Sequence, residues 1–520
     1  MKKILILITI GIALYCFSFF NGFVWDDEAF LQQNPIVSQE AQTMSSQVYF
    51  RPAISVVYST LYSTFGAQSF FYHFFQVLFH ITTAVILFYL CKRFFSENTA
   101  FLLSLLFLVH PSNVEAVCFA SAMQEILFTL MGVAGLYVLI RSKNISALSL
   151  IVSLLFFTTS LLMKETGIMF FVLACGYLLI FHRKNTSIFS LFMAFVIIVL
   201  FTYGIARFSG GNVYVQGGGL FPIMRVSFIT RLINIPQIIL YYLGIFIFPF
   251  HLGIAQHWVV QKITFIDFWL PLGVVAGLFS LLINYHHRYR QEHTQEASSK
   301  RLLHFVRNDK NTHIFFFFFI WFLLGLLPHL QIIPLNMTVA ERWLYFPMIG
   351  LLGMIGSLIG EERSKKTEGR IVLIFLILIS IFFIRSFIRT LDWRNGLALY
   401  GSSIAKTSSF DLQNNMGVEL FRVGKYDEAK KYFEISTRLA PYWWVNWNNL
   451  GAAYEREKKY MKAMECYQKS MQNGDYILAY ENYARSLFSY GKDTGKAEEF
   501  LKKALRLFPE SQTLQMLYRP

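Results

Sequence analysis

Charged residues are scarce in this sequence: they make up only 15% of its 520 residues, whereas soluble proteins carry about 25%. Hydrophobic residues reach 55% and aromatic residues 18%, and phenylalanine alone occurs 55 times. This number of charges is too small to keep the surface of a soluble protein hydrated. Soluble globular, disordered and collagen-like proteins are therefore excluded. The composition indicates an integral membrane protein, and the length is more than that of one ordinary domain.

Cysteine and cofactor-binding signatures are also scarce. The five cysteines are scattered, without a CxxC pair or metal-ligand spacing, so we expect neither a disulfide framework nor a zinc site. No Rossmann fingerprint and no P-loop occurs, which excludes the common nucleotide-binding pockets. His251, His257, Asp267 and His329 are dispersed; we interpret the histidines as interfacial side chains, although a metal role stays open.

Twelve apolar segments are candidates to cross a bilayer, which takes about 20 mostly apolar residues. They are 4–20, 71–90, 99–117, 124–140, 145–163, 166–181, 187–206, 231–250, 269–285, 313–330, 343–360 and 370–388. Loops rich in Lys and Arg mark the cytoplasmic side, and 18 such residues fall in one set of alternate loops against seven in the other. Alternation fails only at 231–250, so we expect 231–267 to enter the membrane and return, which leaves about 11 spans.

The same alternation predicts the orientation. We expect the N-terminus to be cytoplasmic and everything after Ile388 to be extracytoplasmic, with a first extracytoplasmic loop over 21–70. No small-residue cleavage site follows 4–20, so we expect this segment to be a retained anchor. The net charge of +15 divides into +10 for 1–388 and +5 for 389–520, and we attribute it mainly to membrane orientation rather than to nucleic-acid binding.

Self-similarity at a period of 34 residues begins near residue 410 and is typical of tetratricopeptide repeats. Gly417 and Gly451 are 34 residues apart, and Pro441 and Pro509 are 68 apart, which is two periods. We therefore predict an all-α chain in three parts. A multi-span membrane bundle over 1–388 and a connector over 389–409 precede about three repeats over 410–520, which form an α-solenoid that binds or spaces other proteins.

Ionisable residues at the membrane boundary are costly and are therefore candidates for function. Ten of them lie in segments predicted to face the extracytoplasmic side, at the ends of several spans. They are Asp26, Asp27, Glu28, Arg51, Glu115, Glu125, Lys164, Glu165, Glu341 and Arg342. We expect these side chains to form one assembled site.

The motifs WDDEAFLQQNP, RPAISVVYSTLYSTFG, HPSNVEAV, LLMKETG and VAERWLYFP occur in this order, and Asp392-Trp393-Arg394 precedes the repeats. This pattern resembles the bacterial-type membrane O-mannosyltransferases that carry tetratricopeptide repeats. They belong to the GT-C class of polytopic glycosyltransferases, together with the protein O-mannosyltransferases. The resemblance implies an enzyme of the bacterial inner membrane. It would transfer a mannose-like sugar from a polyprenyl-phosphate carrier to a protein or glycan on the extracytoplasmic face.

The resemblance also implies roles for the candidate residues. Asp26 would be the base that takes the acceptor's proton, and Asp27 would orient the acceptor or hold a cation. Arg342, Lys164 and Arg51 would bind the donor phosphate. One base without a covalent intermediate would invert the anomeric carbon. No cofactor is assigned, and a divalent cation stays open.

Five glutamates would position donor or acceptor: Glu28, Glu115, Glu125, Glu165 and Glu341. The family often places a basic residue before the glutamate of the fourth span, whereas this chain has Gln124, so one contact to donor or acceptor is in doubt.

Structural interpretations of the same residues stay open. The aspartates could cap a short helix, and Glu125 could serve in structural pairing or capping. The cations could be interfacial side chains neutralised by Glu165 and Glu341. Two other functions were weighed against the enzyme. A non-catalytic scaffold for envelope assembly would need no acidic first loop. A transporter would favour charges in mid-span or an inverted repeat, and the sequence has neither.

Overall fold

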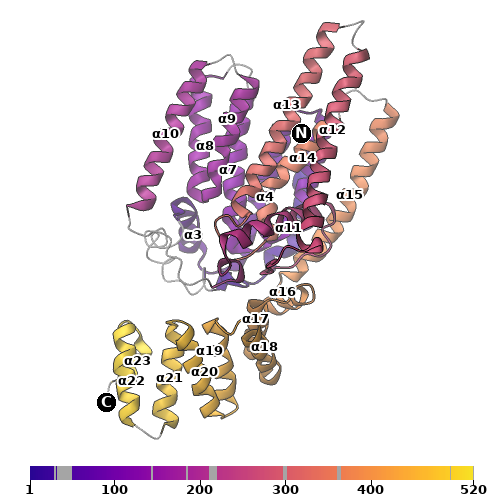
Figure 1. The fold of residues 1–520 in the computed structure, drawn as a ribbon. Helices are drawn as coiled ribbons and strands as arrows, with labels where there is room; N and C mark the ends of the chain where they lie inside the picture. Colours follow the sequence, from indigo (N-terminus) through magenta and orange to yellow (C-terminus); the bar gives the residue numbers. More distant parts are fainter. Residues whose placement is uncertain are drawn as a thin grey trace. The chain divides into compact units, whose positions relative to one another are not determined.

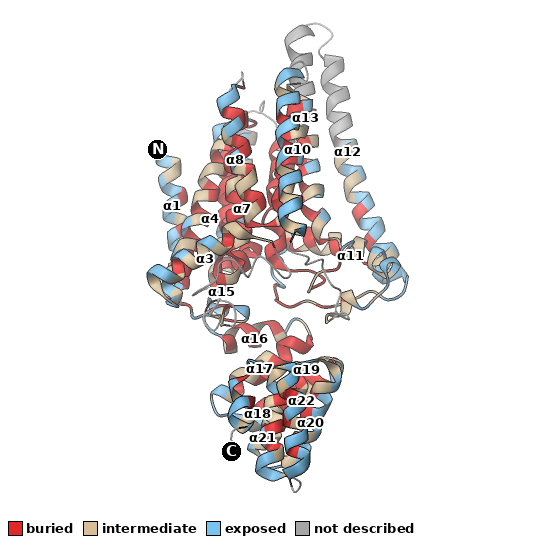
Figure 2. Cartoon of the chain, turned by 90° about the vertical axis from the view of Figure 1, so that its left-hand side faces the viewer, coloured by how far each residue is buried: buried red, intermediate tan, exposed pale blue. Residues whose placement is uncertain are grey.

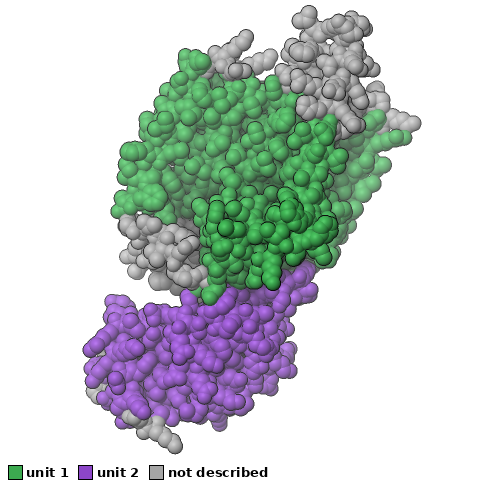
Figure 3. Space-filling view, in the orientation of Figure 1, with its two compact units in different colours: residues 1–395 green, residues 396–520 purple. Residues whose placement is uncertain are grey.

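The computed structural model describes residues 1–28, 31, 50–141, 145–182, 186–209, 220–296, 301–359, 365–491 and 494–518, with side chains left out at 285–296, 301–310 and 365–366. Residues 29–30 and 32–49 of the expected first loop thus lie outside the described residues. The described parts are helical apart from one antiparallel bridge between Gln256 and Val339, so the all-α prediction is confirmed. The chain forms two compact units, Met1–Asn395 and Gly396–Pro520 (Figure 3).

Unit 1 is a helical bundle (Figure 1). Its α-helices are α1 (Lys2–Tyr15), α3 (Pro52–Phe65), α4 (Ser69–Cys91), α5 (Glu97–Val109), α6 (Val114–Cys118), α7 (Met123–Ile140), α8 (Ala147–Met163), α9 (Ile168–Phe181), α10 (Thr186–Phe208), α11 (Phe228–Ile247), α12 (Leu270–Glu296), α13 (Arg301–Leu326), α14 (Pro347–Ile359) and α15 (Lys365–Asp392). Short turns join them: η1 (Cys16–Phe20), η3 (Pro111–Asn113), η4 (Ala120–Ala122), η5 (Glu165–Gly167), η6 (Pro222–Met224), η7 (Phe265–Trp269), η8 (Leu327–His329) and η9 (Glu341–Leu344). Each of the twelve predicted apolar segments coincides with one or more of these helices.

Eight helices of the described chain are long and apolar enough to cross a membrane. A ninth is added when the pair Glu97–Val109 and Pro111–Cys118, bent by 49°, counts as one span. Three further apolar helices are shorter, namely α8, the helix Glu165–Phe181 and α14. The expectation of about 11 spans therefore agrees approximately with the structure.

The helices of unit 1 divide into inner and outer ones (Figure 2). The apolar window of Ala120–Ile140 is 78% buried, whereas that of Thr186–Phe208 is only 6% buried. Inner helices pack closely where glycine removes a side chain: a Cβ on Gly350 would lie 2.5 Å from the backbone nitrogen of Phe322. An outer helix that stays apolar has a surface suited to lipid rather than to water.

Helix α11 contacts one end of the bundle through residues near both of its own ends. Near its start, the Nε atom of Arg231 donates to the carbonyl of Gln331 at 3.1 Å. Near its end, the carbonyl of Phe246 accepts from the Nε2 atom of His110 at 3.0 Å. His110 directly follows α5 and Gln331 lies just after η8, and Figure 1 shows α11 lying across that end of the bundle. Helix α11 is also one of the eight helices long and apolar enough to cross a membrane, so the expectation that 231–267 enters the membrane and returns stays a prediction.

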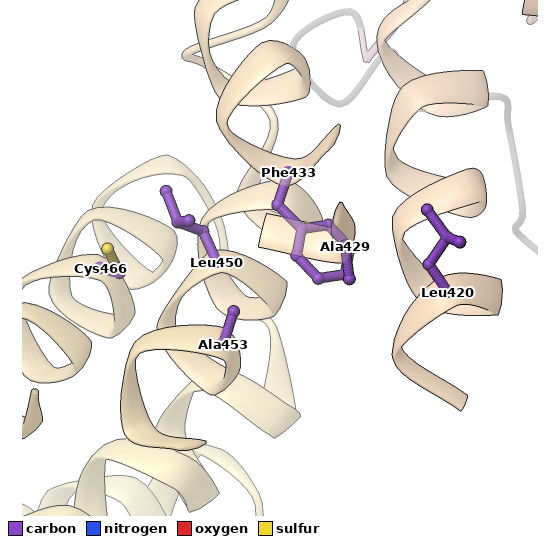
Figure 4. Packing of buried hydrophobic residues seen from close by; sticks show 6 residues of the cluster. All are labelled: Leu420, Ala429, Phe433, Leu450, Ala453 and Cys466. Carbon is purple, nitrogen blue, oxygen red and sulfur yellow. The ribbon is translucent and has the colours of Figure 1, made fainter. Parts of the chain in front are cut away.

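Unit 2 is built from helical pairs. Its helices are α16 (Gly396–Ile404), α17 (Phe410–Arg422), α18 (Tyr426–Leu439), α19 (Trp444–Arg456), α20 (Tyr460–Asn473), α21 (Ile477–Tyr490), α22 (Thr494–Leu507) and α23 (Gln512–Tyr518). The starts of α18, α20 and α22 are 34 residues apart, as the repeat period predicts. Buried residues from successive pairs, including Phe433 and Leu450, form its core (Figure 4).

The repeated glycines of unit 2 have a physical reason. A Cβ on Gly417 would lie 2.5 Å from the ring of Phe433, and a Cβ on Gly451 would lie 2.5 Å from the ring of Tyr467. The same close contact thus recurs one period later. The paired helices need glycine at this position because no larger side chain fits against the aromatic ring.

Candidate active site

The loop after the first span carries one exposed and one buried aspartate. Asp26 is exposed, Glu28 is half-buried, and the side chain of Asp27 is completely buried. Asp27 accepts the backbone N–H of Ser121 at 2.6 Å and that of Val24 at 3.4 Å. Burial raises the pKa of Asp27 from 3.8 to about 7, although the hydrogen bonds from Ser121 and Val24 oppose this shift. Asp27 therefore fastens the loop to the bundle, while Asp26 faces outward.

Trp25, next to Asp26, has a strained backbone. Its φ is 58°, in the left-handed region that side chains other than Asn, Asp or Gly rarely adopt. The indole stacks on Phe119, with 5.2 Å between ring centroids and an interplanar angle of 19°. Strained residues persist where the surroundings hold them in place, and they gather at functional sites. The stacking on Phe119 supplies such a hold beside Asp26.

Arg342 links this loop to the rest of the site. Its guanidinium lies 5.7 Å from the ring of Trp25 and 5.6 Å from that of Phe119. Its side chain pairs with Glu115, whose second oxygen accepts the backbone N–H of Arg342 at 3.0 Å. Burial disfavours the charged guanidinium, but Glu115, Glu125 and Asp26 more than offset it, so the pKa of Arg342 lies above its usual value. Arg342 is thus a fixed cation close to Asp26.

Two further ion pairs lie beside Arg342. Lys164, which follows α8, pairs with Glu125 of α7 and lies 5.4 Å from the ring of Phe128. Arg51, directly before α3, donates from its Nε atom to Glu165 at 2.8 Å. Lys164 and Glu125 are both less than a tenth exposed, whereas the Arg51–Glu165 pair is more open. Lys164 also interacts electrostatically with Arg51 and with Glu165, so the two pairs are neighbours.

Within the described chain, Lys164 and Arg342 do not form ion pairs with the glutamates that are next to them in the sequence. We considered Glu165 and Glu341 as the groups that neutralise Lys164 and Arg342, but Lys164 pairs with Glu125 and Arg342 pairs with Glu115. Consecutive residues in a helical turn point in different directions and do not face each other. Each cation therefore takes its partner from another helix, which ties α6, α7 and the two loops together.

Glu341 belongs to a second buried ion-pair cluster, which is centred on Arg389 and also interacts with Glu115. It accepts from Arg389 of α15 at 3.1 Å, and Arg389 also donates to Asp392 at 2.9 Å. Arg389 and Glu341 are completely buried. Sequence reasoning missed Arg389 because the last span was ended at Ile388, one residue before it. A charged residue at the boundary of that span was the signal that could have found it.

His329 is a second residue that sequence reasoning set aside. It ends η8, is 4% exposed, and stacks on Trp343 with 4.7 Å between ring centroids and an angle of 11°. It interacts electrostatically with Lys164 and Arg342. It is a buried part of this ion-pair cluster rather than an interfacial side chain.

The sequence left two questions about this site, namely what Gln124 contacts and whether a metal ion binds. The amide oxygen of Gln124 accepts from the hydroxyl of Tyr58 at 3.4 Å, so the residue contacts α3. Among the described residues, no group of three or more His, Cys, Asp or Glu side chains is placed to hold a metal ion. Both carboxylate oxygens of Asp27 accept backbone N–H groups, which leaves them poorly placed for a cation.

Comparison with known proteins agrees with this architecture. Residues 52–205 match the family described as dolichyl-phosphate-mannose-protein mannosyltransferase. Residues 410–442 and 446–473 match a tetratricopeptide repeat family, which confirms the prediction from the 34-residue period. The first match covers α3 to most of α10, the part that supplies Glu115, Glu125 and Lys164.

Curated relatives extend over more of the chain. Protein O-mannosyl-transferase F38B6.6 of Caenorhabditis elegans is 22% identical over 465 residues, which are 85% of this chain and 63% of that protein. Protein O-mannosyl-transferase TMTC3 of Homo sapiens is 22% identical over 540 residues, covering 93% of this chain and 56% of the relative. The chain thus spans about 60% of the length of these relatives. The chain is thus similar to the dolichyl-phosphate-mannose-protein mannosyltransferase family in its first half, to tetratricopeptide repeats near its C-terminus, and to proteins named protein O-mannosyl-transferase over most of its length.

Proposed function

We propose that this protein is a membrane glycosyltransferase that transfers a mannose-like sugar from a polyprenyl-phosphate carrier to a hydroxyl group of a protein. The observation that carries this proposal is the exposed Asp26 close to the buried, paired Arg342. A carboxylate open to an acceptor, beside a fixed cation, combines the base and the phosphate-binding group that the reaction needs. The relatives named as O-mannosyl-transferases support the same activity.

Asp26 acts as the base in this proposal. Its carboxylate takes the proton of the acceptor hydroxyl, whose oxygen attacks the anomeric carbon of the sugar. The bond from that carbon to the phosphate oxygen breaks, and its electron pair leaves with the polyprenyl phosphate. A single displacement of this kind inverts the anomeric carbon. Asp27 holds the loop in position through its bonds with Ser121 and Val24.

The cations stabilise the leaving phosphate. Arg342 and Lys164 are held by Glu115 and Glu125 and are largely removed from water, where their attraction for a phosphate is stronger. Arg51 is more exposed and lies towards the edge of the site, with Glu165 fixing its position. The glutamates Glu115, Glu125 and Glu165 therefore orient the cations.

The proposed topology follows from the charge bias of the loops. The N-terminus lies in the cytoplasm, the site faces the extracytoplasmic side, and the repeats follow the last span on that side. We place the protein in a bacterial inner membrane. The repeats would then hold an acceptor protein or a neighbouring enzyme next to the membrane.

The decisive experiment uses purified protein in lipid with a panel of radiolabelled polyprenyl-phosphate sugars and an acceptor protein. We expect the mannosyl donor to label the acceptor, and D26N to lower the rate by about 100- to 10,000-fold, the usual contribution of a positioned base. D267N is the matched control, because Asp267 is an exposed aspartate on η7 whose carboxylate accepts a hydrogen bond from the hydroxyl of Thr264. Full activity of D26N would refute its role, and full cellular function of D26N/D27N would favour the scaffold.

A further inference from the structure

The buried imidazole of His329 lies in the ion-pair cluster, but the proposed reaction gives it no role. His329 is 4% exposed, and its Nδ1 atom is buried without a hydrogen-bond partner in the described chain. Its ring lies flat against Trp343, the residue after Arg342. Lys164 and Arg342 are both near enough to interact with it electrostatically. An imidazole, an ammonium and a guanidinium thus gather from three different segments.

The backbone that carries His329 is held in a fixed shape. Gln331, two residues later, is completely buried and has a φ of 61°. Its side-chain amide donates to the carbonyls of Met337 and Thr338 at 2.8 and 2.9 Å, and its oxygen accepts the N–H of Leu335 at 2.9 Å. The segment between η8 and η9 is therefore closed on itself. One end presents His329 and the other presents Arg342, so their separation is set before any ligand binds.

The absence of a partner for Nδ1 in the described chain requires an explanation. Buried polar atoms in native proteins nearly always have a hydrogen-bond partner, and leaving one without costs free energy. The charged groups that act on His329 are the cations Lys164 and Arg342, which cannot accept a hydrogen bond. An anionic ligand beside them can accept one, and its charge is attracted by both cations.

We propose that His329 donates a hydrogen bond to the phosphate of the polyprenyl-phosphate donor, between Lys164 and Arg342. This inference rests on the proposed function and adds a neutral side chain to the phosphate-binding cations Arg342, Lys164 and Arg51. A neutral imidazole carries one N–H, so it contributes direction without a further positive charge. Negative charge grows on the phosphate oxygens as the bond to the sugar breaks, so the hydrogen bond from His329 strengthens as the reaction proceeds.

The test measures binding rather than turnover. Radiolabelled polyprenyl phosphate and the uncharged polyprenol of equal length are titrated onto wild-type protein and variants in lipid nanodiscs. H329F keeps a flat ring against Trp343 but has no N–H, and we expect it to bind polyprenyl phosphate roughly 10- to 100-fold more weakly. H329N keeps an amide N–H near the position of Nδ1, and H329Q keeps one near the position of Nε2. We expect H329N to restore most of the affinity, because Nδ1 is the buried atom without a partner in the described chain.

His257 provides the matched control. It is also a buried histidine, 8% exposed, and it stacks on Phe221 at 5.2 Å. H257F should bind polyprenyl phosphate as the wild type does. Wild-type affinity in H329F, or equal loss in H329F, H329N and H329Q, overturns the assignment of His329 while leaving the proposed function standing. A wild-type protein that binds polyprenol as tightly as polyprenyl phosphate overturns both proposals.

Discussion

The two units pair their charges in opposite ways. In the candidate site of unit 1, the side chains of Arg342 and Glu115 are only 10% and 1% exposed. In unit 2, those of Arg422 and Glu419 are 47% and 19% exposed. Exposed pairs contribute about 0–1 kcal/mol to stability, whereas buried charges must recover a large cost of desolvation. The comparison teaches that the charges of unit 1 are maintained at a cost, which is why they are the candidates for chemistry.

The largest effect on stability is expected from breaking a buried pair. E115Q leaves the guanidinium of Arg342 buried without its carboxylate, which typically costs about 3–5 kcal/mol. We expect a large drop in the thermal unfolding temperature in detergent, together with weaker binding of polyprenyl phosphate. E165Q is the internal control, since Glu165 pairs with Arg51 in a more exposed position and its loss should cost far less. Equal effects of the two variants would contradict the distinction drawn between them.

A smaller, pH-dependent effect is expected at Asp27. Its pKa in the folded protein is about 7, against 3.8 ordinarily, so the folded state retains a proton that the unfolded state has released between these values. Stability therefore falls as the pH rises from about 4 to about 7, by roughly 4 kcal/mol at most, and then levels off. The difference in unfolding free energy between wild type and D27N, measured from pH 5 to 8, isolates this contribution. A difference independent of pH would show that Asp27 titrates normally.

The smallest effect is expected in the repeats. Lys430 and Glu457 form an ion pair between neighbouring repeats, with side chains 21% and 20% exposed. Removing it with K430M should change the stability of unit 2 by about 0–1 kcal/mol. The thermal unfolding of the full chain, monitored at the repeats, provides the measurement. A loss as large as that of E115Q would mean that exposure does not separate the two classes of ion pair.

The sequence predicted much of the fold because its signals are local. Apolar segments about 20 residues long indicate spans wherever they occur, and the 34-residue recurrence of glycine follows from one repeated contact with an aromatic ring. The order of the motifs also indicated the family, and the matches over 52–205 and 410–473 agree with it. Each of these features can be recognised without knowing which segments touch.

The sequence predicted which residues belong to the candidate site, but it did not predict which of them form ion pairs with each other. Charge at the ends of spans indicated Asp26, Lys164 and Arg342, because ionisable groups at a membrane boundary are rare. The partners of Lys164 and Arg342 come from other helices, and neighbours in the sequence were the wrong guide to them. His329 was passed over because a lone histidine carries no spacing signal.

The sequence by itself determined that the chain carries membrane-spanning helices and tetratricopeptide repeats, since composition and periodicity act over short stretches. Only the tertiary structure decided that Asp27 is buried while Asp26 is exposed, that Arg342 pairs with Glu115, and that His329 lies near two cations. Burial and pairing depend on which distant segments meet, and they set the cost of each charge. That cost separates a solvated side chain from one held in place for chemistry.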